Sequence, residues 1–343
     1  MIVRARAPLR LGFGGGGSDL SPYCDEYGGY VLNATIDKYA YATIEPRADG
    51  NLRLVAADRN KAWQGPADAG AMVGGDLELH CGTYNRIVRE FNRGQPLPVT
   101  MTTMADVPPG SGLGSSSTLV VAMVKGFVEL LNLPLGEYDI AHLAFEIERK
   151  DLGLSGGRQD QYAAAFGGVN FMEFYDSDRV VVNPLRVKNW ILSELEASIV
   201  LFYTGVSRSS AAIIDEQTKN IGSASEPEAL QAMHRVKEQA LRMKASLLRG
   251  DLRSFCDAIN ASWASKKRTA RSISNELIED IHRRAVAAGA RGGKISGAGG
   301  GGVMMLFVDP ERRMDVHRAL QQVEGQLFTC HFTEHGTQGW KIF

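Results

Sequence analysis

The sequence has almost no excess charge of either sign, which excludes partners that are held by charge alone. Its 38 basic and 39 acidic residues leave a formal net charge of −1. So balanced a chain has no overall field to attract nucleic acid or an anionic membrane surface. We therefore expect neither nucleic acid nor a membrane as a partner.

Long apolar runs are also missing. The longest, around Leu119–Val124, is interrupted by Lys125 and is much too short to span a bilayer. The first residues, MIVRARAPLRL, read as a strand and lack the uninterrupted apolar stretch of a secretory signal. We therefore expect neither export nor membrane insertion.

Cysteine is scarce, and its few occurrences are far apart. With no CxxC pair, the cysteines indicate neither a disulfide framework nor a metal site. This pattern fits the reducing cytoplasm, which is where we expect the protein. The cysteines are Cys24, Cys81, Cys256 and Cys330.

Glycine, in contrast, is in excess and unevenly distributed. The chain has 38 glycines among 343 residues, above the usual share of about 7%. Because glycine has no side chain, it lets the backbone approach a small charged group closely. The clusters are the first indication of function. They lie at residues 12–17, 110–114, 153–157 and 292–302.

The length of 343 residues exceeds that of a typical single domain, and we expect two domains. Strand-like segments dominate the opening, where Pro8 separates Ile2–Ala7 from Leu9–Phe13. The second half is mostly helical, between a strand at Ser198–Thr204 and closing strands that end with Gln326–Thr333. No repeat or low-complexity linker marks the boundary, which we place near residue 185.

Three segments near the middle of the chain matter for function. The strand Leu97–Ala105 runs directly into a Pro-Pro corner. After the glycine-rich segment that follows, Ser117–Leu131 is almost wholly apolar over four turns, which predicts a buried helix. A further helix is expected at Gln159–Phe166.

The segment between this strand and the buried helix is the strongest single signal. Its glycines allow successive N–H groups to point into one concavity, and the helix N-terminus adds roughly half a positive charge. Its serines can cap the helix, with Ser115 or Ser116 as N-cap, or reach a phosphate or Mg²⁺. Capping alone would not need so many glycines and serines, so we interpret the segment as an anion-binding loop. Its residues are Pro109, Gly110, Ser111, Gly112, Leu113, Gly114, Ser115, Ser116 and Ser117.

Two other glycine motifs resemble nucleotide loops, but each lacks a necessary part. Gly12–Gly17 satisfies GxGxxG after a strand, yet Pro22 stands where the long helix of a dinucleotide site should run. Gly293-Lys294 resembles the end of a P-loop, but Ile295 replaces the required Ser or Thr. We therefore expect neither a Rossmann site nor a Walker-type ATPase.

Three ordered motifs make the chain similar to the GHMP kinases, the family of galactokinase, homoserine kinase, mevalonate kinase and phosphomevalonate kinase. The central motif is Pro-x-x-x-Gly-Leu-Gly-Ser-Ser at Pro108–Ser116. The first is Ala7–Leu11, continuing to Asp19, and the third is Lys294–Gly302. Together they span nearly the whole chain.

This resemblance implies an α+β fold of two domains. Residues 1–185 would form a ribosomal protein S5-like domain, and residues 186–343 a ferredoxin-like domain. The resemblance also implies two cofactors, ATP and Mg²⁺. ATP would lie against the Pro109–Ser117 loop, and a small sugar or sugar phosphate would lie between the domains.

The same resemblance assigns the metal ligands. Ser116, the second serine after Gly-Leu-Gly, resembles the family's Mg²⁺-ligating hydroxyl, and Glu148 resembles the acidic residue that completes the site. Such an oxygen-only pair, supplemented by phosphate and water, suits Mg²⁺. Neighbouring Glu146 could be confused with Glu148, which could also be a solvated residue on a helix face.

Asp160 resembles the family's aspartate that acts on the attacking hydroxyl, and Arg10 occupies the family's Lys/Arg position in the first motif. Phosphoryl transfer mostly needs positioning, neutralisation of charge and a base or anchor for the attacking oxygen. A fixed cation can lower the pKa of the hydroxyl and hold the aspartate. In the simpler alternatives, Asp160 is the N-cap of its helix and Arg10 points outward from an exposed strand.

Asp19 indicates the acceptor, because it follows Arg10 at the interval found in galactokinases. A short carboxylate can accept hydrogen bonds from vicinal hydroxyls. Where galactokinases carry Glu-His, however, this chain has Gly16-Gly17 before Ser18-Asp19. The chain is therefore similar to sugar 1-kinases of the heptose 7-phosphate and fucose type. This implies transfer to the anomeric hydroxyl of D-glycero-D-manno-heptose 7-phosphate.

Several alternatives stay open at this point. A fucose, galactose or mevalonate kinase and a catalytically silent sugar sensor could share these motifs. The missing Glu-His argues against galactose, and Asp19 argues against mevalonate. The joint presence of Ser116, Glu148, Asp160 and Arg10 argues against the sensor. The oligomeric state is open, and a homodimer is compatible with the sequence.

An acceptor that already carries a phosphate would need cations or free N–H groups from the second half. Arg208, at a predicted helix start, is one candidate. The run Lys266, Lys267 and Arg268 is another, although such charges are more often only surface charge. The C-terminal glycine loop adds two predicted substrate-binding residues, Gly297 and Gly299.

Overall fold

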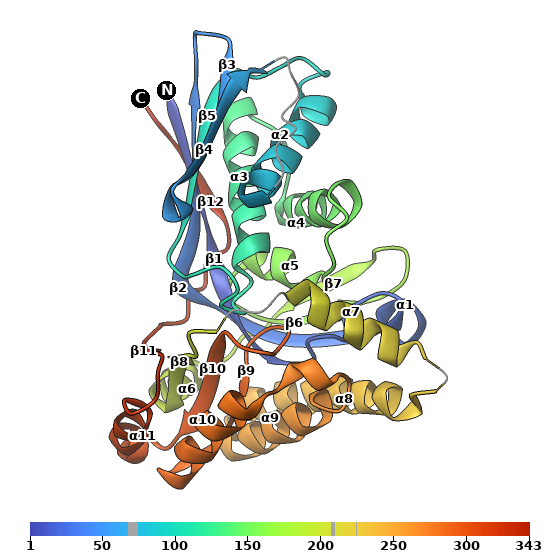
Figure 1. Cartoon of the computed structure of the whole chain (residues 1–343), viewed down its shortest axis with the longest axis vertical. Coiled ribbons are helices and arrows are strands. Elements are labelled where there is room, and N and C mark those ends of the chain that lie inside the picture. Colours follow the sequence, from blue (N-terminus) through green and yellow to red (C-terminus); the bar gives the residue numbers. More distant parts are fainter. Residues whose placement is uncertain (68–74, 207–209, 224) are drawn as a thin grey trace.

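Two β-sheets with helices packed against them form the part of the chain that the computed structural model describes, residues 1–67, 75–206, 210–223 and 225–343. Figure 1 shows the larger sheet in the upper half of the molecule and the smaller sheet in the lower half. This mixed architecture confirms the expected α+β class.

The larger sheet has eight strands. They are β1 (Ile2–Gly14), β2 (Gly29–Pro46), β3 (Asn51–Ala56), β4 (Lys61–Pro66), β5 (Val99–Ala105), β6 (Val169–Phe174), β7 (Val180–Pro184) and β12 (Gln338–Ile342). Six of them follow in the order β12-β1-β2-β5-β3-β4, while β6 pairs with the other end of β2 and β7 pairs with β6. All pairs are antiparallel except β3 with β5.

The first strand, β1, connects the two halves of the molecule. Its residue Ala7 packs into the core of the upper half, whereas Leu9 and Phe13 pack into a second core with elements of the lower half. We expected Pro8 to divide this segment into two strands, and that expectation is wrong. A shift of register between Pro8 and Arg10 accommodates the residue without an amide, so the strand continues.

The central helix of the upper half is α3 (Ser115–Leu131), which begins two residues before its predicted start. It is buried against β1 and β2 on one side and against three helices on the other. A side chain at Gly126 would lie 2.8 Å from Cδ1 of Ile44, so this glycine lets the helix lie close on the sheet. The three helices are α2 (Glu78–Phe91), α4 (Glu137–Glu146) and α5 (Gln159–Phe166).

The smaller sheet has four antiparallel strands in the order β11-β8-β10-β9. They are β8 (Ile199–Tyr203), β9 (Ala290–Ile295), β10 (Val303–Val308) and β11 (Gln326–Phe328). The neighbouring helices are α6 (Asn189–Ser198), α7 (Ser210–Ile221), α8 (Pro227–Arg249), α9 (Leu252–Lys266), α10 (Glu276–Ala287) and α11 (Arg313–Leu320). A short helix, α1 (Tyr23–Tyr27), lies between β1 and β2 in the chain.

Strand β10 is buried on both faces, and alternate residues supply two different cores. Met305 and Phe307 pack toward α8 and α9, in the core that also contains Leu9 and Phe13 of β1. Met304 and Leu306 pack in a separate core with α10 and α11. This alternation follows from the period of two along a strand.

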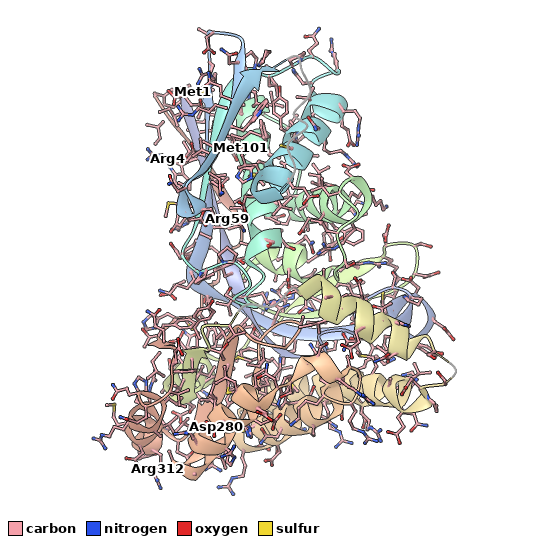
Figure 2. The ribbon with its side chains drawn as sticks, viewed as in Figure 1. Met1, Arg4, Arg59, Met101, Asp280 and Arg312 are labelled. Atoms are coloured by element: carbon pink, nitrogen blue, oxygen red, sulfur yellow. The ribbon has the colours of Figure 1, made fainter. Side chains whose placement is uncertain are left out.

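The two chain ends meet in the larger sheet. Strand β12 pairs with β1, and Ile342 lies opposite Ile2. Figure 1 accordingly shows N and C side by side at the upper left, and Figure 2 labels Met1 there, whereas Asp280 and Arg312 are near the bottom. The domain boundary near residue 185 stays a prediction. The last strand of the second half, β12, belongs to the larger sheet.

Four helices and strands were not expected from the sequence: α1, β4, α6 and β12. The segments of β4 and β12 are short, carry glycine and lack a clear apolar alternation, so neither shows the usual strand pattern. The strand expected at Gln326–Thr333 ends at Phe328, in β11. The predicted bounds of α5 are confirmed.

The core shared by the two halves predicts a stability effect. The ring of Phe255 in α9 lies with its centroid 5.5 Å from that of Phe13 in β1 and 5.9 Å from that of Phe307 in β10. Truncation by Phe255→Ala should lower the free energy of unfolding by about 3–5 kcal/mol, because it leaves a cavity where the halves meet. Urea denaturation measures this change.

The matched control is Phe343→Ala, which removes a ring that is fully exposed. It should change stability by less than about 0.5 kcal/mol. Equal effects of the two substitutions would mean that the shared core does not hold the halves together.

Candidate active site

A cleft of about 270 Å³ is lined by residues from both halves of the molecule. It lies where the N-terminus of α3 approaches α5, the start of α7 and the loop between β9 and β10. Most of the predicted site residues line it. These are Arg10, Gly16, Gly17, Asp19, Gly110, Gly112, Gly114, Ser115, Ser116, Ser117, Glu148, Asp160 and Gly297.

The N-terminus of α3 forms one wall of the cleft. Gly114 is its N-cap, with φ 79° and ψ 20°, and no side chain caps the helix. The alternative with Ser115 or Ser116 as N-cap is therefore wrong. Because the first turn of a helix has N–H groups without partners in the helix, this uncapped end can bind an anion.

The central and C-terminal glycine loops are packed backbone against backbone. A Cβ atom on Gly112 would lie 2.3 Å from the carbonyl oxygen of Ser296, and one on Gly297 would lie 2.8 Å from that of Gly112. The N–H of Val303 donates to the carbonyl of Ser111 at 2.8 Å. The loop between β9 and β10 thus packs against the loop before α3 and holds its backbone in place.

A buried ion pair faces the N-terminus of α3. Arg10 is 3% exposed, and its Nε and Nη2 lie 2.8 and 2.7 Å from Oδ1 of Asp160. The same guanidinium donates through Nη1 to the carbonyl of Gly112 at 2.6 Å and to Oγ of Ser296 at 3.2 Å. Arg10 is therefore not an outward-facing strand residue. Asp160 is in the first turn of α5, whose N-cap is Arg158, so Asp160 is not a cap.

Asp19 fixes the loop after β1 to the start of α5. Its Oδ2 accepts the N–H groups of Arg158 and Gln159 at 3.0 and 3.2 Å. Its Oδ1 accepts the N–H of Gly17 and the side-chain amide of Gln159, both at 3.0 Å. The carboxylate is only 1% exposed and has four protein donors. Asp19 therefore positions α5, and with it Asp160.

A buried carboxylate lies beside the first turn of α3. Glu148 lies in a π-helical turn after α4 and is 2% exposed. The hydroxyl of Ser117 donates a hydrogen bond to its Oε1 at 3.0 Å. Gln161 donates to its Oε2. Burial raises the pKa of Glu148, although Arg149 and these donors act in the opposite direction.

The structure separates Glu148 from its neighbour in sequence. Glu146 lies outside the cleft, where it forms ion pairs with Arg86 and Lys150. The serine that contacts Glu148 is Ser117 rather than Ser116, because consecutive helical residues point about 100° apart. Ser116 is exposed and lines the same cleft.

Two buried lysines add positive charge behind Arg10. Lys266, at the end of α9, lines the cleft and donates from Nζ to the carbonyl of Gly297 at 2.8 Å. Lys294 on β9 donates to the carbonyl of Gly12. Burial lowers the pKa of Lys266 to about 8, and it lowers that of Lys294 well below its usual value.

Five predicted site residues do not line the cleft, among the residues that the structure describes. Leu113 is fully buried in the shared core, and Ser111 is also buried. Ser18 donates to the carbonyl of Gly15, and a Cβ on Gly299 would lie 2.7 Å from the carbonyl of Ile273. Pro109 is the fifth. Arg208 lies outside the described residues.

Sequence reasoning missed several residues that line the cleft or lie buried beside it. Gln159 and Gln161 flank Asp160 and hold Asp19 and Glu148, and the only signal for them was this adjacency. Arg149 donates to the carbonyls of Leu154 and Gly157, which fixes the loop before α5. Gln217 of α7 lies in a helix with no motif.

One wall of the cleft can bind an anion and another presents a carboxylate held by a cation, an arrangement that suits a phosphotransferase. Residues 78–168 match the family model of the GHMP kinases N terminal domain, and residues 243–325 match that of GHMP kinases C terminal.

Relatives resemble this chain over its full length. It is 48% identical over 340 residues to D-glycero-alpha-D-manno-heptose 7-phosphate kinase of Campylobacter jejuni, with 99% of each chain covered. A D-glycero-D-manno-heptose 1-phosphate kinase structure from Bacteroides thetaiotaomicron has a TM-score of 0.85 and 44% identity, covering 99% of each chain. A putative sugar kinase structure from Campylobacter jejuni has a TM-score of 0.82 and 46% identity, covering 99% of this chain and 98% of the other.

The chain therefore belongs to the GHMP kinases, a family of ATP-dependent enzymes, and has the two-domain fold of that family.

The contact between Gly114 and Asp160 generates a prediction. A Cβ atom on Gly114 would lie 3.1 Å from Cγ of Asp160, and the backbone there has φ +79°. Gly114→Ala should lower kinase activity by at least about 10-fold, because the methyl group moves the carboxylate and narrows the anion site. It should also lower stability by about 1–2 kcal/mol through backbone strain.

Gly94→Ala is the control, because Gly94 has φ +72° and nothing within 4 Å of the added atom. It should show the same loss of stability with unchanged activity. Steady-state kinetics and urea denaturation on both variants separate the two effects. Full activity of Gly114→Ala would contradict the assignment of this wall.

Proposed function

We propose that this GHMP kinase transfers the γ-phosphate of ATP to the anomeric hydroxyl of D-glycero-D-manno-heptose 7-phosphate. The observation that carries the proposal is the Arg10–Asp160 pair, held in one cleft with the uncapped N-terminus of α3. The heptose 7-phosphate acceptor is supported by the relative that is 48% identical over the full chain and carries that name.

The N-terminus of α3 would hold the phosphates of the nucleotide. The N–H groups of its first turn have no side-chain cap, and the helix dipole favours negative charge at this end. Gly112 and Gly114 have positive φ and no side chains, so the backbone can contact phosphate oxygens directly. As negative charge grows on the phosphates during transfer, these fixed donors stabilise it.

Asp160 would act on the attacking hydroxyl. Arg10 donates hydrogen bonds to Oδ1 of Asp160. No residue in the described part of the chain donates a hydrogen bond to Oδ2. Oδ2 is therefore available to accept the proton or hydrogen bond of the acceptor hydroxyl. Arg10 orients the carboxylate by donating twice to Oδ1, so that Oδ2 can serve as a base or an anchor for the hydroxyl.

Glu148 and the serines at the start of α3 would hold Mg²⁺. Their carboxylate and hydroxyl oxygens are ligands that Mg²⁺ prefers. Burial raises the pKa of Glu148, which indicates that its negative charge lacks full compensation by the protein alone. A divalent cation would supply that compensation, so the residues fit the ion. When bound, Mg²⁺ supplies charge neutralisation to the phosphates.

The acceptor would lie on the side of the cleft formed by Gly16 and Gly17. The pair leaves room for a larger sugar where galactokinases would place two side chains. Asp19, also predicted for the acceptor, is fully occupied by protein donors and would act mainly by fixing this loop and α5.

We place the enzyme in the cytoplasm, where ATP and sugar phosphates are found. The four cysteines are all free thiols, which agrees with a reducing compartment. Within the described residues, no helix combines the length and apolarity needed to cross a bilayer. A homodimer stays a prediction.

The role of Asp160 predicts a loss in kcat. Asp160→Asn should lower kcat by about 10²–10⁴-fold, because the amide cannot take a proton from the hydroxyl. The KM for ATP should stay within about 3-fold, since Asp160 does not contact the nucleotide wall through a hydrogen bond. A coupled assay of ADP release, with sugars and sugar phosphates as acceptors, measures both values.

That assay also tests the acceptor. The highest kcat/KM is expected with D-glycero-D-manno-heptose 7-phosphate, above fucose, galactose and mevalonate. Wild-type turnover by Asp160→Asn would reject its catalytic role, and a preference for another acceptor would reject the proposed substrate alone.

The metal site predicts different effects for two adjacent serines. Ser117→Ala should raise the Mg²⁺ concentration for half-maximal activity by about 10-fold, because Ser117 contacts Glu148. Glu148→Gln should have an equal or larger effect. Ser116→Ala, at the exposed neighbour, should change the Mg²⁺ requirement less. A larger effect at Ser116 would favour the ligand assignment made from the family motif.

A further inference from the structure

A lysine at the end of α9 reaches the cleft from the lower half of the molecule. Lys266 is 5% exposed, and its Nζ donates to the carbonyl of Gly297 at 2.8 Å. An ammonium group carries three N–H donors. Among the residues that the structure describes, only Gly297 accepts one of them. The other two are left for whatever occupies the cleft, which Lys266 lines.

The position of this ammonium is on the acceptor side. Its Nζ lies 3.8 Å from where a Cβ atom on Gly16 would be, and the side-chain amide of Gln159 lies 3.4 Å from the same point. The absence of a side chain at Gly16 therefore leaves open space directly beside the ammonium.

The charges that face Lys266 do not fully neutralise it. Asp19 and Asp160 attract it, and Arg10 and Lys294 repel it. Both carboxylates already have protein partners: Asp160 pairs with Arg10, and Asp19 accepts four N–H groups. Two buried basic side chains, Arg10 and Lys266, thus line a cleft in which the two carboxylates nearest Lys266 already have partners. An oxygen-rich, negatively charged ligand would complete this arrangement.

Burial of this side chain does not serve stability. An ammonium that leaves water for one hydrogen bond to a carbonyl loses more hydration than it regains. Burial accordingly lowers the pKa of Lys266 to about 8. A cleft residue held in such a state by specific neighbours is a candidate for function.

We propose that Lys266 is an acceptor-binding residue, whose two remaining N–H groups donate to oxygen atoms of the sugar phosphate. This inference rests on the proposed function of the cleft. It also selects one residue from the basic run Lys266, Lys267 and Arg268. Lys267 pairs with Glu279 at 2.8 Å, and Arg268 pairs with Glu228 at 3.2 Å, so neither is directed into the cleft.

Steady-state kinetics with Lys266→Met test the proposal, because methionine keeps most of the side-chain volume but has no donor and no charge. The kcat/KM for D-glycero-D-manno-heptose 7-phosphate should fall by about 30-fold or more, as for the loss of charge-assisted hydrogen bonds. The KM for ATP should stay within about 3-fold. The Tm should be unchanged or higher, because a poorly solvated charge is removed.

Lys267→Met is the matched control. It removes the adjacent ammonium, which is paired outside the cleft, and should leave all kinetic constants within about 2-fold. Repeating the comparison with the heptose that lacks the 7-phosphate separates the two sources of oxygen. A loss with both acceptors assigns the contact to hydroxyl groups, and a loss only with the phosphorylated one assigns it to the phosphate. Either result supports the proposal.

The pH dependence of kcat/KM for the acceptor distinguishes substrate binding by Lys266 from a purely structural role, which would not change it. The charged form of Lys266 is lost as pH rises through about 8, so kcat/KM for the acceptor should fall above that pH. Lys266→Arg, whose charge persists, should remove this alkaline limb while retaining part of the activity.

Three results would overturn the proposal: unchanged acceptor kinetics in Lys266→Met, a loss confined to the KM for ATP, or the same loss in Lys267→Met. If the wild-type enzyme does not use heptose 7-phosphate, the proposed substrate is wrong. The variants are then compared with the sugar phosphate that does drive ADP release, so the two failures are distinguishable.

Discussion

One guanidinium group holds the site together. Arg10 comes from β1, and through four contacts it binds Asp160 of α5, the carbonyl of Gly112 in the central loop and the hydroxyl of Ser296 in the C-terminal loop. A lysine could not make these contacts at once, because it presents a single point of charge rather than a planar fork of donors. The desolvation of this buried arginine is offset only because all of its neighbours are in place.

The excess of glycine has a second explanation besides phosphate binding. Gly112 and Gly297 touch through their backbones, and Gly302 lies against the carbonyl of Ser111, so any side chain would push the two loops apart. All three have positive φ, where other residues are strained. The C-terminal loop therefore acts largely as a support for the loop at α3. Its Gly299 packs in the same way against Ile273 rather than lining the cleft.

Features that depend on local sequence pattern could be predicted. Features that depend on contacts between segments far apart in the chain could not. The glycine-rich turn before α3, the bounds of α5 and the proximity of Arg10 and Asp160 were within reach, because local pattern and the resemblance to a family motif carry them. Strand β12 was not, since its partner β1 is at the other end of the chain. The serine beside Glu148 could not be chosen either, because only the rotation of α3 turns Ser117, and not Ser116, toward that carboxylate. Likewise, only the packing of α9 distinguishes Lys266 from the two cations after it.

The pairing of β12 with β1 closes the polypeptide almost into a ring. With Ile2 opposite Ile342, a short peptide could join residues 1 and 343 without crossing the molecule. New ends could then be opened in the loop between β2 and β3 at Gly50, where an added Cβ atom would meet nothing within 4 Å. A chain rearranged in this way would keep every lining residue of the cleft in one uninterrupted piece, from Gly110 through Ala298 and across the joint to Leu20.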